Sequence, residues 1–212
     1  MIKHKSFKHG WFYHYRVHEK KLENTCRDKF LPLSEYLYDM FENCPQSYFE
    51  KGPRSSGLRF DVETKLETHN NHEVSKLAKE AQGFDEYKTA HTKVQVFMLN
   101  YDKNSIGAEI PIWLMPEELG CYKELFNDKN PLTGHIDVLQ IKNNKIWVWD
   151  YKPKAHLEKF ATTQTYFYAL MLSKRTGIPL DDFMCGYFDE KIAYTFEPSK
   201  TKLPMISLST TS

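Results

Sequence analysis

The chain has 212 residues, of which 41% are hydrophobic and 27% are charged, and these fractions are ordinary for a globular domain. A formal net charge of +1 excludes a generic polycation, so any affinity for nucleic acid has to come from local patches. No apolar run is long enough for a membrane helix, and residues 1–16 lack the apolar core of a signal peptide, so we expect a cytoplasmic protein without membrane contact.

Two stretches of the chain are basic. Residues 1–21 carry Lys3, Lys5, Lys8, Arg16, Lys20 and Lys21, and residues 142–159 carry Lys142, Lys145, Lys152, Lys154 and Lys159. Each stretch taken alone favours a solvated, charged face over a nucleic-acid patch. The aromatic residues within the first stretch could stack on bases, but core packing or a dimer contact is the simpler interpretation.

The first segment of the chain predicts one short helix and a boundary. Residues 34–43 favour a helix with Ser34 as its N-cap. A cluster of turn residues at 51–57 then predicts a loop. We therefore expect residues 1–57 to form an aromatic and basic segment packed on the core, and residues 58–212 to form the main domain.

The next segment predicts one helix and two strands. Residues 68–82 favour a helix that Thr68 or Asn70 can cap. Residues 92–99 alternate at first and then become apolar, which predicts a strand. Residues 107–114 predict a second strand, and the proline within it indicates an edge position or a bulge.

The runs GHIDVLQI and KIWVWDYK predict a β-hairpin, because Asn143 and Asn144 between them tolerate the positive φ of a two-residue turn. Counting outward from that turn places Asp137 opposite Asp150. Opposed residues share a face of the sheet, with Cβ atoms roughly 5 Å apart. Lys152 is two residues beyond Asp150 and shares that face too.

The remaining chain predicts a long helix over residues 156–176, which Gly177 ends. A closing hairpin is expected around Asp189-Glu190, and the tail after Pro198 is expected to be loose. Helices and strands in this order predict an α/β or α+β fold, in which a central mixed sheet is flanked by helices.

The two opposed carboxylates suggest chemistry. Opposed carboxylates repel each other, and the second strand of the hairpin is apolar on both faces and should be buried. Buried acids need a partner, and Mg²⁺ prefers one or two carboxylates together with water and phosphate oxygens. The alternative is that both aspartates are solvated at strand ends, with the lysine as their salt-bridge partner.

Three motifs in order resemble the PD-(D/E)XK nuclease superfamily. They are G-H-I-D at 134–137, D-Y-K at 150–152, and Gln164-x-x-x-Tyr168 in the following helix. The pattern is similar to that of the RecB-type branch, which includes the CRISPR-associated adaptation nucleases, and archaeal Holliday-junction resolvases are the nearest other branch. The proline of the superfamily's name is replaced by Ile136.

The resemblance implies a restriction-endonuclease-like core and a role for each matching residue. Asp137 and Asp150 would bind Mg²⁺ or Mn²⁺, and Lys152 would be the catalytic lysine. Gln164 and Tyr168, one helical turn apart, would contact the nucleic acid or support the site, unless they only pack against the sheet.

The resemblance also implies a further metal ligand in an early helix. His72 is the best placed, adjacent Glu73 would serve in a resolvase-like site, and His69 is a third option. Neighbouring helix positions point about 100° apart, so we expect only one of the first two to face the site. Glu109 resembles a further acidic position of the family.

The cysteines do not reproduce the cluster-binding pattern of some RecB-type members. Cys26, Cys44, Cys121 and Cys185 are scattered and contain no C-x-x-C pair, so neither a disulfide framework nor a zinc site is expected. We expect no iron–sulfur cluster, and a cluster that draws on all four thiols is the alternative.

The sequence thus favours a metal-dependent DNA nuclease acting in replication, recombination or repair. It leaves open an exonuclease or single-strand nuclease of the RecB type and a structure-specific, Holliday-junction-like endonuclease, which would be a homodimer. A non-catalytic nucleic-acid-binding protein on the same fold is the second class. An unrelated binding or structural protein is the third.

Overall fold

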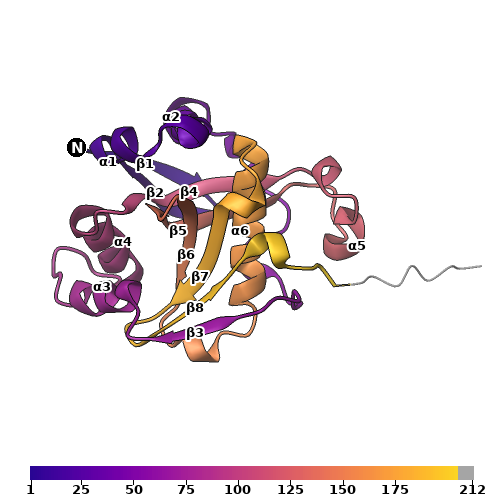
Figure 1. Cartoon of the computed structure of the whole chain (residues 1–212). Coiled ribbons are helices and arrows are strands. Elements are labelled where there is room, and N and C mark those ends of the chain that lie inside the picture. The colour runs from indigo at the N-terminus through magenta and orange to yellow at the C-terminus, as the bar shows by residue number, and fades with distance from the viewer. Residues whose placement is uncertain (205–212) are drawn as a thin grey trace, which may run out of the picture.

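The β-hairpin predicted from the two asparagines lies in the middle of an eight-stranded sheet (Figure 1). The computed structural model describes residues 1–204. The strands are β1 (Ile2–His9), β2 (Trp11–His18), β3 (Glu67–Asn70), β4 (Ser105–Leu114), β5 (Leu132–Lys142), β6 (Lys145–Tyr151), β7 (Phe183–Phe188) and β8 (Ile192–Phe196). Their order across the sheet is β1-β2-β4-β5-β6-β7-β8-β3.

Six α-helices accompany the sheet in the described part of the chain. They are α1 (Glu19–Thr25), α2 (Leu31–Asn43), α3 (Glu73–Ala81), α4 (Ala90–Tyr101), α5 (Tyr122–Phe126) and α6 (Ala161–Thr176). All neighbouring strands are antiparallel except β6 and β7, and α6 forms the crossover between these two. The predicted mixed sheet flanked by helices is therefore confirmed.

Helices cover both faces of the sheet (Figure 1). On one face, Val74 of α3 and Val94 of α4 pack with Trp149 of β6. On the other face, Phe167 and Met171 of α6 join the larger core, to which β1, β2 and α2 also contribute. Burial on both faces explains why β6 is apolar at successive positions. Among residues 1–204, no helix combines the length and the apolar character needed to cross a bilayer.

The β5–β6 hairpin has the predicted turn and register. Asn143 and Asn144 have φ values of 52° and 58°, as a tight two-residue turn requires. Residue pairs run outward from Lys142–Lys145 to Val138–Trp149, where the recorded pairing ends. The next residues on the two strands are Asp137 and Asp150, so the hairpin brings both aspartates to the same place in the sheet.

The strand predicted at 92–99 is wrong, because these residues lie in helix α4. Thr89 caps this helix by accepting a hydrogen bond from the backbone N–H of Thr92 at 3.2 Å. Residues on several sides of α4 are buried, including Val94, Val96 and Met98. A short apolar run of this kind cannot be distinguished from a strand by its periodicity.

Three predicted helix starts differ from the structure. Helix α2 begins at Leu31 with a proline in its first turn, so Ser34 is not its N-cap. Residues 67–70 form β3 on β8, and α3 therefore begins only at Glu73. Residues 155–157 form a 3₁₀ turn, which delays α6 to Ala161, although Gly177 ends that helix in the left-handed conformation as predicted.

The other strand predictions agree better with the structure. The strand at 107–114 is β4, with a register irregularity near Gly107, and Pro111 lies beyond the two residue pairs that join β4 to β2. The closing hairpin is β7 and β8. The tail was expected to be loose after Pro198, but residues 198–200 form a 3₁₀ turn and Lys202 pairs with Glu63. Residues 205–212 lie outside the described part of the chain.

Candidate active site

A cavity of about 150 Å³ opens where the pairing of β5 and β6 ends. It is lined by Tyr13, Arg54, Ser55, Ser56, His91, Glu109, Thr133, Gly134, His135, Asp137, Asp150, Lys152, Gln164 and Tyr168. All three residues of the predicted catalytic group line it. So do three of the predicted accessory residues, namely Glu109, Gln164 and Tyr168.

Asp137 is held from two directions. The backbone N–H of Tyr151 donates to its Oδ2 at 2.9 Å, and Gln95 Nε2 donates to its Oδ1 at 3.3 Å. His91 Nε2 lies 3.9 Å from the same Oδ2. Because His91 and Gln95 are one turn apart on α4, that helix presents both side chains to the carboxylate.

Asp150 is more deeply buried, with 2% of its side chain exposed. Its Oδ2 lies 2.8 Å from Lys152 Nζ, and its Oδ1 accepts a hydrogen bond from Gln164 Nε2 at 3.2 Å. The same amide nitrogen lies 2.6 Å from the hydroxyl oxygen of Tyr168, one turn further along α6. Gln164 and Tyr168 are therefore joined to Asp150 and do more than pack against the sheet.

The charges of the site are unbalanced. Burial, and next the charge of Asp150, raise the pKa of Asp137 well above its ordinary value. Burial lowers the pKa of Lys152, but the charges of Asp150 and Asp137 outweigh this effect and leave that pKa raised. Two carboxylates, that of Asp150 buried and that of Asp137 15% exposed, thus share one ammonium group, and the site has room for further positive charge.

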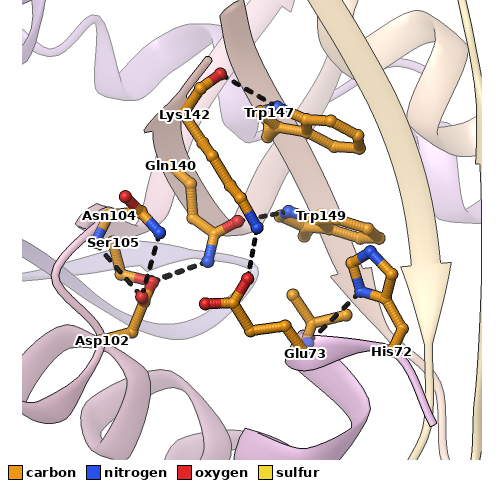
Figure 2. Close-up of polar contacts among 10 residues, drawn as sticks. His72, Glu73, Asp102, Asn104, Ser105, Gln140, Lys142, Trp147 and Trp149 are labelled. Carbon is orange, nitrogen blue, oxygen red and sulfur yellow. Dashed lines mark hydrogen bonds and ion pairs between the residues drawn. The ribbon is translucent and has the colours of Figure 1, made fainter.

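The three predicted helix ligands lie elsewhere, and Figure 2 shows two of them, His72 and Glu73. His72 caps α3 by accepting from the backbone N–H of Val74 at 3.3 Å, and its ring lies 5.5 Å from that of Trp149. Glu73 forms an ion pair with Lys142 at the hairpin turn. His69 Nε2 lies 2.7 Å from Thr195 Oγ1 on β8. None of the three lines the cavity, because β3 replaces the first turns of the helix in which we expected them.

Glu109 does line the cavity, in an unusual conformation. Its φ is 51°, although it lies within β4, and its carboxylate accepts a hydrogen bond from the backbone N–H of His14. This contact ties β4 to β2 beside the site. His91 is the histidine that the sequence analysis missed, and the Thr89 cap before it was the available indication of a helix there.

One of three comparisons with known proteins gives a match. A family model described as the PD-(D/E)XK nuclease superfamily matches residues 7–203, which is most of the chain. The chain belongs to the PD-(D/E)XK nuclease superfamily. A comparison with curated proteins and another with solved structures give no match. Membership of the superfamily suggests a metal-dependent nuclease, and the fold is restriction-endonuclease-like.

The donors that the cavity offers fit a divalent cation of the kind PD-(D/E)XK nucleases generally use. Within residues 1–204, no group of three or more His, Cys, Asp or Glu side chains is arranged as a closed metal cluster. Mg²⁺ does not need one, because it takes one or two carboxylates and completes its coordination with water and phosphate. Asp137 and Asp150 are such a pair, and His91 and Glu109 line the same cavity.

Gly134, the first residue of G-H-I-D, allows Tyr168 to approach β5. A Cβ atom at this position would lie 2.5 Å from both Ser55 Oγ and Tyr168 Cε1. We expect Gly134→Ala to lower the free energy of unfolding by about 1–3 kcal/mol, as overpacked cores do, and to slow cleavage by displacing Tyr168 from Gln164. Urea denaturation of Gly134→Ala and of Gly120→Ala, whose Cβ meets nothing within 4 Å, would check this. Equal stability of the two variants would contradict it.

Two buried histidines, His9 and His135, contact each other at the wall of the cavity. His9 Nδ1 lies 2.8 Å from His135 Nε2, so one ring donates and the other accepts, and the accepting ring must be neutral. Burial lowers the pKa of His9 from 6.5 to about 4. Burial, together with the charges of His9 and Arg54, lowers the pKa of His135 well below its ordinary value. The folded protein therefore resists protonation of both rings.

This pair predicts a loss of stability in acid. Between pH 6.5 and about 4 the unfolded chain binds protons that the folded chain does not, so stability is full above pH 6.5 and falls below it. The slope should approach about 1.4 kcal/mol per pH unit for each histidine. Unfolding in urea at pH 7 and pH 5 should show a smaller loss for His9→Gln than for wild type or for the exposed control His156→Gln. Equal losses in all three would refute this assignment.

Proposed function

We propose that this protein is a deoxyribonuclease that hydrolyses phosphodiester bonds with a Mg²⁺ or Mn²⁺ ion at Asp137 and Asp150. The observation that carries the proposal is the cavity beyond the β5–β6 pairing, where two buried carboxylates and one lysine meet. A structural core gains nothing from two acids buried side by side, because each loses hydration and repels the other. The same pair is well suited to a cation that also binds phosphate.

Each residue of the cavity has a distinct part in this proposal. Asp137 and Asp150 would bind the ion, with His91 or Glu109 as a further donor. A bound divalent ion supplies a Lewis acid for the phosphate and makes water acidic enough to attack it. Lys152, 2.8 Å from Asp150, would hold an oxygen of the scissile phosphate or orient the attacking water. Gln164, supported by Tyr168, would fix the orientation of the Asp150 carboxylate.

We further propose membership of the RecB-type branch, on the basis of the ordered G-x-x-D, D-x-K and Q-x-x-x-Y motifs, and a role in DNA replication, recombination or repair. The mode is either that of an exonuclease or single-strand nuclease or that of a structure-specific endonuclease. A homodimer that makes paired nicks in four-way junctions would support the second mode. A processive monomer that releases short products would support the first.

A panel of DNA substrates tests the proposal. The wild-type chain, incubated with Mg²⁺ or Mn²⁺, should cleave single-stranded DNA, duplex ends or four-way junctions, and excess EDTA should stop the reaction. If no substrate is cut with either ion, the protein is not a deoxyribonuclease under these conditions. Retained DNA binding would then favour the non-catalytic alternative, a nucleic-acid-binding protein on the same fold.

A further inference from the structure

Two large aromatic side chains are exposed at the tip of the β1–β2 hairpin. Trp11 is 77% exposed and Phe12 is 60% exposed. They directly follow Gly10, which makes the turn with a φ of 77°. Within residues 1–204, neither ring stacks on another aromatic ring, whereas most tryptophans bury much of their surface. A tryptophan this exposed offers a ring face on which a ligand can stack.

This tip is continuous with the candidate active site. Tyr13, two residues after Trp11, lines the cavity, and its ring stacks on that of His135 at a centroid distance of 3.6 Å. Alternate residues of a strand share one face and lie roughly 7 Å apart, so Trp11 extends the cavity wall outward from Tyr13. On the neighbouring strand, Trp11 pairs with His9, whose side chain contacts His135 from below.

The tip is also held firmly. His9 stacks on Phe49 at a centroid distance of 3.8 Å. The Nη2 atom of Arg54 donates to the carbonyl of His9 and to that of Phe49, the latter at 3.0 Å. The hairpin is thus fixed to the loop that forms the opposite side of the cavity. A hairpin whose backbone is already fixed loses little backbone entropy when a ligand binds at its tip.

Positive charge accompanies the aromatic rings. Arg54 and Lys152 line the cavity, whereas exposed Lys8 pairs with Phe12 on the other face of the hairpin from Trp11. The recorded hydrogen bonds of Arg54 within the described chain use Nη2, which leaves Nε and Nη1 to bind an anion. An exposed ring beside a cavity with two cations matches a nucleic-acid strand, which presents bases next to phosphates.

We propose that Trp11 stacks on an unpaired base next to the scissile phosphate, so that the substrate is DNA with unpaired nucleotides at the cut. This inference rests on the proposed nuclease function and narrows its substrate. The faces of bases inside a duplex are covered by their neighbours, so only a single strand, a frayed end or a branch point offers bases for stacking.

The test separates the contribution of the bases from that of the phosphates. Binding of the full chain is measured in EDTA, which prevents cleavage, with a short single-stranded DNA and with an abasic strand of equal length and charge. Wild type should bind the strand with bases about tenfold more tightly. Trp11→Ala should lose this preference while its affinity for the abasic strand stays unchanged, and Phe12→Ala, which removes the exposed ring on the other face, should keep it.

Two further variants control the experiment. Trp11→Phe keeps a stacking ring, so it should keep the base preference but lose most of the tryptophan fluorescence quenching on binding, because Trp11 is the exposed tryptophan. Tyr101→Ala removes another aromatic that is 65% exposed, at the end of α4, and should behave as wild type.

Three results would overturn the inference. They are equal binding of the two strands by wild type, an unchanged base preference in Trp11→Ala, and a wild-type dimer that Trp11→Ala converts to monomers, which would make the tip a self-association surface. Cleavage without base preference would remove this inference and leave the nuclease intact. Base preference without cleavage would leave a base-stacking surface but remove the nuclease function, and with it the scissile phosphate that the inference invokes.

Discussion

Replacement of Lys152 by alanine should reduce the rate of DNA cleavage by about 10³-fold or more while the protein stays folded. A single charged group aimed at the reacting phosphate contributes a factor of this order. Lys152 is the cation nearest Asp150, at 2.8 Å, and its side chain is only 19% exposed. Initial rates of cleavage with Mn²⁺ measure the loss of activity, and circular dichroism of the variant shows whether it stays folded.

A matched control is available for this prediction. Lys65 has a side chain that is 90% exposed and does not line the cavity, so Lys65→Ala should cleave as wild type does. Lys152→Arg keeps the charge but changes the shape of the donor, so it should recover only part of the rate. An equal loss of cleavage rate in Lys152→Ala and Lys65→Ala would mean that these lysines act only through the overall charge of the protein.

Asp137→Asn should make the protein more stable and inactive at once. Without metal, the buried carboxylate of Asp137 lies near that of Asp150, and removing its charge should raise the free energy of unfolding by about 1 kcal/mol, or roughly 2–4 °C in Tm. Asparagine can still accept the hydrogen bond from the backbone N–H of Tyr151. Its amide nitrogen then faces Gln95 Nε2, and a 180° turn of the Gln95 amide lets Gln95 Oε1, which is buried without a partner in the described structure, accept a hydrogen bond from it.

The Tm of thermal unfolding, measured in EDTA and in Mn²⁺, tests both the higher stability and the loss of metal binding. Wild type should gain stability on addition of Mn²⁺, because an ion that binds only the folded state stabilises it. Asp137→Asn should start from a higher Tm in EDTA and gain little from the ion. Asp61→Asn, at an exposed position, should match wild type in both conditions. A lower Tm of Asp137→Asn in EDTA would show that this carboxylate stabilises the fold.

The fold could be predicted where local chemistry decides it. Asn143 and Asn144 fix a tight turn, and the side-chain period of two then fixes which residues lie opposite each other. The helix at 90–101 could not be predicted, because its burial on several sides hides its period from the sequence. The short strand at 67–70 exists because it pairs with β8, a partner more than a hundred residues away.

In the candidate site too, residues close in sequence were predicted and residues brought in by distant contacts were not. Asp137, Asp150 and Lys152 belong to one hairpin, so the sequence predicted their meeting. His91 reaches Asp137 from α4, most of which was predicted to be a strand. Arg54 reaches the site through contacts with the distant β1–β2 hairpin, which no local pattern predicts. We expected His72 or Glu73 to bind metal because we placed both inside a helix that began at residue 68. Residues 67–70 instead pair with β8, and α3 begins only at Glu73.

Electron paramagnetic resonance of Mn²⁺ tests the central assignment most directly, because it reports binding without any assumption about the DNA substrate. Bound Mn²⁺ loses the sharp signal of the free ion. Wild type mixed with one equivalent of Mn²⁺ should diminish that signal, whereas Asp137→Asn and Asp150→Asn should leave most of it. An undiminished signal with wild type, or equal binding by all three proteins, would contradict a metal centre at these two aspartates.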